Sequence, residues 1–306
     1  MVSLEVLRLR SRLLQEVRRF FLARDYLEVE TPIRQPVLIP EGHIRLFASE
    51  GWWLQASPEL CMKRLLAAGC QKIFQICHCF RRDEVGELHL PEFTMLEWYQ
   101  AGWDYNQLMS ECEELVRAVA HAAPWPAVAG AKDDRCLHRQ GRSVDLHGPW
   151  PRLTVREACR RHGGRDPLTL LQEDGFDQFL VEEVEPQLGW QQPLFLCDYP
   201  IELGSLARPR ADDAGVAERF ELYLASVELA NGFSELNDAE EQERRFCAER
   251  ARMSPQAATP LPRRFLRDLS RMPAAAGVAL GLDRLFMLLC GATSVQAVAA
   301  FTPDDL

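Results

Sequence analysis

The sequence predicts an α+β fold in which a mostly antiparallel sheet is flanked by helices. Apolar and polar residues alternate in several short segments, and most of these follow one another through short polar connections, as antiparallel strands do. Segments with a helical period lie between and after them, which places helices around the sheet. The chain has 306 residues, 47% of them hydrophobic. We expect one domain over 1–306, with a loop or insertion at 121–152, where Pro, Gly and charged residues show no period.

The elements follow in order along the chain. Apolar residues at helical spacing, with Arg between them, predict an amphipathic helix over 4–24. Ser57, as N-cap, and Pro58, as first helical residue, begin a second helix that ends at Gly69. Further helices are expected at 104–123, 155–163, 176–188, 238–253 and 282–291. Strands are expected at 26–31, 52–56, 72–82, 92–100, 193–200 and 276–281, with two more joined by a tight turn over 218–236.

Composition excludes several classes of protein. No apolar run reaches the roughly 18 residues that a membrane span needs, and Glu5 and Glu16 interrupt the N-terminal segment, so neither a signal nor a transit peptide is expected. Ten Cys in mostly apolar surroundings indicate reduced thiols and a cytoplasmic protein. The net charge of −10, from 35 basic and 45 acidic residues, argues against a large nucleic-acid footprint.

One short stretch, Cys77-His78-Cys79, has the residue types of a metal site. In a strand, however, Cys77 and Cys79 face one way and His78 the other. No second Cys/His pair supplies the missing zinc ligands. The stretch therefore predicts a strand within a sheet and no structural zinc.

Common nucleotide-binding signatures are missing, since the sequence has no P-loop and no GxGxxG. Strand geometry offers another way to hold a nucleotide. Phe93, Glu97 and Tyr99 share one face of the strand at 92–100, and Arg81 ends the preceding strand. Arg81 suits a phosphate, Phe93 a flat base, and Glu97 an incoming ammonium group. The alternative is that Arg81 and Glu97 pair with each other across the hairpin.

A second group of acids lies in the segment FELYLASVELANGFSEL. Glu221 and Glu228 flank the hairpin turn, where they repel each other unless a cation such as Mg²⁺ lies between them. A bulge at Asn231-Gly232 is expected to turn Glu235 toward the same groove. The alternative is that these acids are solvated at a sheet edge.

The segment GVALGLDRLF contributes a third group. Gly277 and Gly281 allow a ligand or another backbone to approach the strand closely. Arg284 lies in the first turn of the following helix, where the helix dipole disfavours a cation. A phosphate bound there would explain it.

Together these segments resemble the catalytic domain of class II aminoacyl-tRNA synthetases, specifically of the lysyl type. FRRDEVGELHLPEFTMLEWY resembles motif 2 of that class, GVALGLDRLFML its motif 3, and YLEVETP the end of motif 1, the element that forms dimers. ELANGFSELNDAEEQ is similar to a lysyl-specific segment. The resemblance covers most of residues 4–300 and is weak over 121–152.

The resemblance implies roles for individual residues, together with ATP as co-substrate, Mg²⁺ and a homodimer. Arg81 and Arg284 contact the phosphates as catalytic residues, Phe93 stacks on adenine, and the other ATP-binding residues are Arg82, Asp83, His89, Leu90, Glu228, Leu229 and Gly281. Glu221 and Glu228 hold Mg²⁺. Glu59 and Glu97 receive the α-ammonium of the amino acid, Asn231 its carboxylate, and Glu235 with Tyr99 the far ammonium of lysine, with Ser57, Pro58 and Ala279 lining the same pocket.

Two features narrow the resemblance. A tRNA-charging lysyl enzyme has an anticodon-binding domain before the motif 1 helix, whereas here that helix begins at Leu4. Ala279 stands where those enzymes have Gly. Both favour the stand-alone branch that attaches lysine or β-lysine to a lysine ε-amine of elongation factor P. Departures from the pattern are Asp83 for Glu, Arg82 for Asn and Leu90 for a polar residue.

Three functions remain to be compared. The preferred hypothesis is an ATP-dependent ligase that activates lysine or β-lysine as an aminoacyl-adenylate and transfers it to elongation factor P without a covalent enzyme intermediate. The alternatives are the same chemistry with an RNA acceptor, and a non-catalytic ligand-binding paralogue. A basic surface for the acceptor, or a solvated helix face, is formed by Arg263, Arg264, Arg267 and Arg271.

Overall fold

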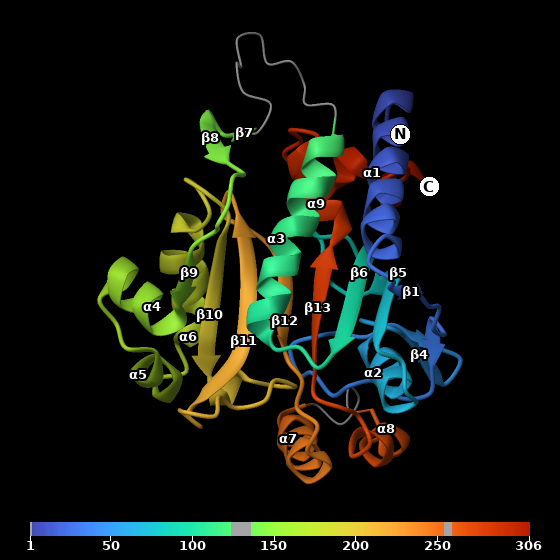
Figure 1. Ribbon diagram of the computed structural model, residues 1–306, viewed down its shortest axis with the longest axis vertical. Coiled ribbons are helices and arrows are strands. Elements are labelled where there is room, and N and C mark those ends of the chain that lie inside the picture. Colours follow the sequence, from blue (N-terminus) through green and yellow to red (C-terminus); the bar gives the residue numbers. More distant parts are fainter. Residues whose placement is uncertain (1, 124–135, 254–258) are drawn as a thin grey trace.

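An eight-stranded sheet runs through the centre of the molecule (Figure 1). The structure is a computed structural model, and it describes residues 2–123, 136–253 and 259–306. Neighbouring strands are antiparallel, except that β1 runs parallel to β5 and β9 parallel to β10. The strand order is β1 (Leu27–Glu28), β5 (Lys72–Phe80), β6 (Glu92–Ala101), β13 (Ala275–Gly281), β12 (Val227–Ser234), β11 (Val216–Leu224), β10 (Leu194–Pro200) and β9 (Arg152–Thr154).

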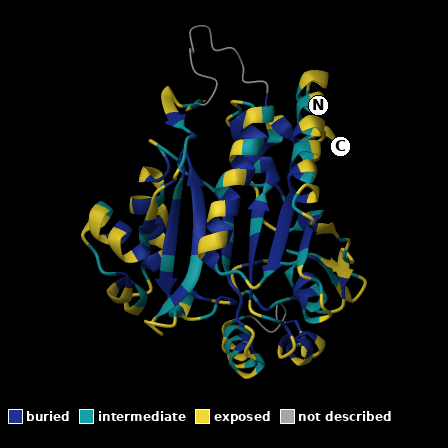
Figure 2. Ribbon diagram, in the orientation of Figure 1, coloured by how far each residue is buried: buried dark blue, intermediate teal, exposed yellow. Residues whose placement is uncertain are grey.

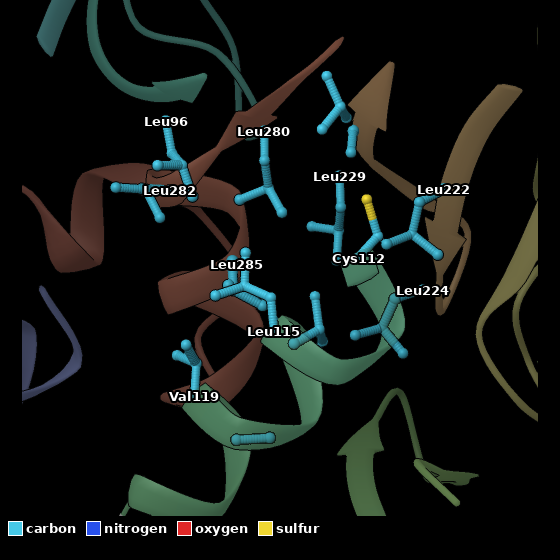
Figure 3. Close-up of a cluster of buried hydrophobic side chains, with 14 of the residues drawn as sticks. Leu96, Cys112, Leu115, Val119, Leu222, Leu224, Leu229, Leu280, Leu282 and Leu285 are labelled. Carbon is cyan, nitrogen blue, oxygen red and sulfur yellow. The ribbon is translucent and has the colours of Figure 1, made fainter. Parts of the chain in front are cut away.

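Three helices cover one face of this sheet: α1 (Leu4–Leu22), α3 (Tyr105–Ala122) and α9 (Leu282–Leu289). Leu115 and Val119 of α3 meet Leu285 of α9, and both helices pack on Leu96 and Leu280 of the sheet (Figure 3). Asp104 begins α3 with a capping box that includes Gln107. Leu96 and Trp98 belong to this core, so Glu97, between them on β6, faces the opposite side.

The opposite face carries smaller elements that leave part of the sheet uncovered by helices. There α2 (Glu59–Ala67) and α8 (Arg263–Leu269) form a second core with β5 and β6, and α7 (Ala239–Arg252) packs beside α8. A third core lies under α4 (Val155–Gly163) at the far edge. The remaining elements are β2 (Arg34–Gln35), β3 (Ala48–Ser49), β4 (Trp52–Leu54), β7 (Cys136–Arg139), β8 (Arg142–Asp145), α5 (Pro167–Gln172), α6 (Phe176–Phe179) and the short helices at 180–184, 185–187, 201–203, 295–298 and 303–305.

The mostly antiparallel sheet with flanking helices is confirmed, and burial follows it, with the strands dark and the outer helix faces exposed (Figure 2). Two local predictions need correction. The cap position of α2 is Pro58, although the Ser57 hydroxyl oxygen does accept from the Glu59 amide at 2.9 Å. The strand predicted at 26–31 pairs only over Leu27–Glu28.

The expected bulge is also elsewhere. The pairing of β12 with β13 is regular through Asn231 and Gly232. The register shifts instead between β11 and β12, where Leu222 pairs with Ala230 but Tyr223 with Glu228. Glu228 and Asn231, three residues apart, would face opposite ways in a regular strand, and the extra residue brings both to one side.

The single-domain organisation stays a prediction. Of the loop expected at 121–152, residues 124–135 lie outside the described residues, and β7 and β8 form a hairpin in the part that follows. In the ranges that the structure covers, no helix is both long and apolar enough to pass through a membrane.

Candidate active site

A cavity of about 390 Å³ opens on the face of the sheet opposite α3. Its floor is one row of paired residues, in which Glu97 of β6 lies beside Ala279 of β13, Ala279 beside Asn231 of β12, and Asn231 beside Glu221 of β11. Neighbouring strands lie about 4.8 Å apart, so this row is about 14 Å long. The predicted residues on the cavity wall are Ser57, Glu59, Arg81, His89, Leu90, Phe93, Glu97, Glu221, Glu228, Leu229, Asn231, Ala279, Gly281 and Arg284.

Glu97 forms one end of the row, and its side chain is buried, with 1% of the residue exposed. The Tyr99 hydroxyl donates to Oε2 at 2.8 Å, while Oε1 accepts no hydrogen bond within the described residues. Burial, and then the nearby charge of Glu59, raise the pKa of Glu97 to about 8, against the effect of Ser57 and Tyr99. An ammonium group brought into the cavity would supply the missing partner.

Behind this end lies an internal cation that sequence reasoning missed. Lys63, on α2, is 1% exposed, and its Nζ lies 2.5 Å from both Glu59 Oε1 and Glu235 Oε2. Burial lowers the pKa of Lys63, but the charges of Glu235 and Glu59 more than offset this and raise it. The spacing of Glu59 and Lys63, four residues apart on a helix, is a sequence signal that could have revealed half of this cluster.

Glu235 and Tyr99 therefore lie behind the cavity wall and not on it. The carboxylate predicted to meet the far ammonium of a substrate contacts the ammonium of Lys63 here. Gly277 makes room for this arrangement, because a Cβ there would lie 2.2 Å from the Tyr99 ring and 2.6 Å from Glu235 Oε1.

The opposite side of the cavity carries the two predicted catalytic cations. Arg284 Nη1 donates to the Glu228 carbonyl at 2.8 Å and contacts its carboxylate at 3.2 Å. Nη2 lies 2.6 Å from His89 Nε2. Burial, and then the charge of Arg284, lower the pKa of His89, so its ring is a neutral acceptor. Arg284 is thus positioned in the first turn of α9, as expected.

Arg81 follows β5, with its guanidinium 5.3 Å from the centre of the Phe93 ring. Its ion pair is with Glu84, at 3.7 Å, so the alternative of an Arg81–Glu97 pair is wrong within the part of the chain that the structure describes. Arg81 Nε is buried and has no hydrogen-bond partner among the described residues. Such an unsatisfied donor suits an anionic ligand.

Three other predicted residues lie off the cavity wall. Arg82 and Asp83 are exposed on the loop after β5, where Arg82 contacts Asp83 at 3.6 Å and Asp83 contacts Arg45 at 3.4 Å. Pro58 is buried at the start of α2. Their contact with a bound ligand stays a prediction.

The carboxylates predicted to hold Mg²⁺ line one wall of the cavity. Glu221 is buried and accepts from the Tyr223 hydroxyl at 2.8 Å and from Arg219 Nη2 at 2.6 Å. Glu228, half-buried, is paired with Arg284. Solvation at a sheet edge is therefore wrong for Glu221. Across the described ranges no cluster of three His, Cys, Asp or Glu offers a complete metal site. Two carboxylates fit Mg²⁺ when phosphate oxygens complete its shell.

Arg219 is a second residue that sequence reasoning missed. Its Nε donates to Asn231 Oδ1 at 3.2 Å, and its guanidinium lies 4.4 Å from the centre of the Tyr199 ring. Because the Asn231 oxygen is occupied, the amide NH₂ is left to donate into the cavity. Arg219 thus connects the predicted carboxylate-binding residue with Glu221.

The Cys77-His78-Cys79 stretch lies within strand β5, as predicted. Cys77 and Cys79 share one side of β5, with sulfurs 3.8 Å apart, and His78, on the other side, contacts Glu92. On and beside α8, Arg263 pairs with Glu243, and both Arg267 and Arg271 contact Asp268. A basic acceptor surface formed by these Arg stays a prediction.

Comparisons with known proteins add an independent result. The model of the tRNA synthetase class II family (D, K and N) matches residues 2–305. The chain is 37% identical over 319 residues to the elongation factor P–(R)-β-lysine ligase of Histophilus somni, an alignment that covers 99% of this chain and 96% of the relative. It is 40% identical over 314 residues to the ligase of the same name from Salmonella arizonae, with 96% and 94% covered.

Proposed function

The chain belongs to the class II tRNA synthetase family, and from this premise we propose that it is an ATP-dependent ligase for elongation factor P. It activates lysine or β-lysine as an aminoacyl-adenylate and transfers the aminoacyl group to a lysine ε-amine of that factor. The observation that carries the proposal is the buried Glu97 carboxylate, which has an open acceptor oxygen in a cavity that also holds three Arg. The names of both relatives agree with it.

The cationic side of the cavity binds ATP in this proposal. Arg81 and Arg284 contact the phosphates, because guanidinium groups match phosphate oxygens in charge and shape. The adenine stacks on Phe93. His89 and Asp83 assist from the loop, and the remaining contacts come from Arg82, Leu90, Leu229 and Gly281.

Glu221 and Glu228 would hold Mg²⁺ together with the phosphates of ATP. The ion neutralises phosphate charge and so favours attack on the α-phosphorus. In the structure Arg219 pairs with Glu221 and Arg284 with Glu228, so these carboxylates would have to serve both an Arg and the metal when ATP is bound.

The acidic side of the cavity binds the amino acid. Glu59 and Glu97 pair with its nearer ammonium, beside Ser57 and Pro58. Asn231 donates to its carboxylate, and Ala279, between Glu97 and Asn231 in the floor row, sets how deeply the backbone of the substrate enters. Glu235 and Tyr99 act on the far ammonium from behind the wall.

The reaction then has two steps. The substrate carboxylate attacks the α-phosphorus in line, and pyrophosphate leaves. The acceptor amine attacks the acyl carbon of the adenylate, and AMP leaves. The enzyme contributes positioning and charge stabilisation and forms no covalent bond with either substrate. A homodimer in the cytoplasm, the other part of the proposal, rests on the resemblance.

Two measurements test the proposal. Pyrophosphate exchange with ATP and Mg²⁺ is measured with α-lysine, (R)-β-lysine and norleucine, which lacks the far ammonium. Exchange with either lysine but not with norleucine is expected, and no exchange with any of them would mean a non-catalytic paralogue. Labelled product is then sought on elongation factor P and on tRNA, and label on tRNA alone would identify an RNA-charging enzyme.

A further inference from the structure

A loop between β2 and β3 closes one side of the cavity and contributes Glu41, His43 and Ile44 to its wall. Two contacts fix the loop in place around these residues. The Gly42 amide donates to Glu249 Oε1 of α7 at 2.8 Å, and the Arg82 amide donates to the Arg45 carbonyl at 2.7 Å. The loop is therefore attached to both α7 and the loop after β5.

The Glu41 carboxylate of this loop has no role in the proposed binding of ATP or of the amino acid. It is half-buried, and it makes no ion pair or hydrogen bond with any residue that the structure describes. Burial, and then the charge of Glu59, raise its pKa to about 7, while Arg81 opposes the rise, Glu249 adds to it and Arg219 opposes it. Glu41 thus lines the same cavity as Glu59 and Arg81 and is close enough for both of their charges to affect its pKa.

The second step of the proposed reaction needs a proton acceptor. A lysine ε-amine has an ordinary pKa of about 10.4, so only about one in a thousand or fewer is neutral and nucleophilic at pH 7. A general base acts best when its own pKa lies near the working pH. Three other carboxylates on the wall already have partners, since Glu59 has Lys63, Glu84 has Arg81, and Glu228 has Arg284. Glu97 is assigned to the substrate ammonium in the proposed function.

We propose that Glu41 is the general base of the transfer step, accepting a proton from the ε-ammonium of the acceptor lysine. The freed lone pair forms the carbon–nitrogen bond, and the carbon–oxygen bond to the phosphate breaks with its electron pair leaving on AMP. The second proton that the nitrogen loses on becoming an amide leaves with the AMP phosphate. Glu41 returns its proton to solvent. This inference rests on the proposed function and deepens it.

The experiment measures the two steps separately with Glu41→Gln. Adenylate formation is followed by pyrophosphate exchange, and transfer by a single turnover of preformed adenylate with elongation factor P. We expect exchange within about twofold of the unsubstituted enzyme and transfer at pH 7 slower by about 10²-fold or more. The deficit should shrink toward pH 9.5, because the acceptor amine then loses its proton without help. Glu41→Asp should recover part of the rate.

Two further variants make the result specific. Glu50→Gln, the same change at an exposed carboxylate nearby in the chain, should keep both rates. His43→Gln tests the histidine of the same loop, whose pKa burial lowers, and this variant should transfer within about threefold of the unsubstituted enzyme.

Several outcomes would overturn the inference. Unchanged transfer in Glu41→Gln would do so, as would loss of transfer in His43→Gln, which would make His43 the base. A raised KM for the amino acid in exchange would show that Glu41 binds a substrate ammonium instead. A deficit independent of pH would indicate a positioning role. If the unsubstituted enzyme gives no exchange, the proposed function itself fails, and the role of Glu41 with it.

Discussion

The acidic and the cationic sides of the cavity differ in how their charged side chains are compensated. On the acidic side the carboxylates of Glu97 and Glu235 are buried, and the compensating cation, Lys63, is buried as well. On the cationic side Glu228 and Arg284 are half-buried and pair at the cavity wall. Water can screen the second pair but hardly reaches the first.

The difference indicates how many charges each side leaves for a ligand. Lys63 contacts Glu59 and Glu235 but not Glu97, which leaves one carboxylate oxygen of Glu97 open. Arg284 and Arg219 each already hold a carboxylate, so a nucleotide with its metal has to take over pairs that exist. The acidic side therefore offers an open carboxylate oxygen without rearrangement, whereas on the cationic side ligand binding would have to replace existing pairs.

The largest effect is expected from Lys63→Met, which removes the internal cation while nearly keeping the size of the side chain. Glu59 and Glu235 would then be uncompensated, and breaking a buried pair in this way costs about 3–5 kcal/mol. The free energy of unfolding in urea measures the loss. Lys72→Met is the matched control and should cost about 1 kcal/mol, because among the described residues the Lys72 ammonium contacts a backbone carbonyl and a ring but no carboxylate.

The double variant Lys63→Met with Glu235→Gln sharpens this result. It removes one of the two uncompensated carboxylates, Glu235, and should restore part of the lost stability. A cost below about 1 kcal/mol for Lys63→Met alone would contradict the view that the acidic side depends on an internal cation.

Glu97→Gln should affect ligand binding more than folding. It removes the acceptor that becomes charged when an ammonium group pairs with it, and a hydrogen bond to a charged group is worth about 1.5–3 kcal/mol. The expected loss is about 10- to 150-fold in kcat/KM for lysine in pyrophosphate exchange. Glu92→Gln, on the same strand but exposed, is the control and should keep the rate. Equal exchange by both variants would remove Glu97 from the amino acid site.

The pH dependence of the free energy of unfolding of Glu97→Gln tests whether burial raises the pKa of Glu97. The pKa of Glu97 is raised from 4.5 to about 8 in the folded protein. Its contribution to stability is therefore complete below about pH 4.5 and is lost as pH rises to about 8. The free energy of unfolding of Glu97→Gln should gain on the unsubstituted protein by up to about 1.4 kcal/mol per pH unit across this window. A flat difference would show that Glu97 is ionised throughout.

Local patterns predicted much of the cavity. Period-two alternation placed Phe93 and Glu97 together on one face, and the first turn of a helix placed Arg284 at the cavity wall. These inferences need only neighbours in sequence, because strand and helix geometry fixes where such side chains point. The hairpin of Glu221 and Glu228 was predicted for the same reason.

What was missed depends on contacts between distant segments. Lys63 meets Glu235 across 172 residues, and periodicity carries no information on such a pair. The extra residue of β12 lies near Leu229, whereas the sequence predicted a bulge at Asn231-Gly232. A register shift depends on how two strands pair, and the sequence of one strand does not determine it. Glu41 reaches the cavity on a loop that hydrogen bonds hold against α7 and against the loop after β5.

The smallest effect is expected from Ala279→Gly, in the middle of the floor row. Ala279 lies between Glu97, the proposed partner of the amine, and Asn231, the proposed partner of the carboxylate. The amine and carboxylate of β-lysine are separated by one more carbon than those of α-lysine, so one methyl group here changes which spacing fits. A methyl-sized change discriminates by about 1–3 kcal/mol. We expect the ratio of kcat/KM for (R)-β-lysine to that for α-lysine to fall about tenfold in pyrophosphate exchange. An unchanged ratio with both rates lowered would mean that Ala279 supports the sheet and does not measure the substrate.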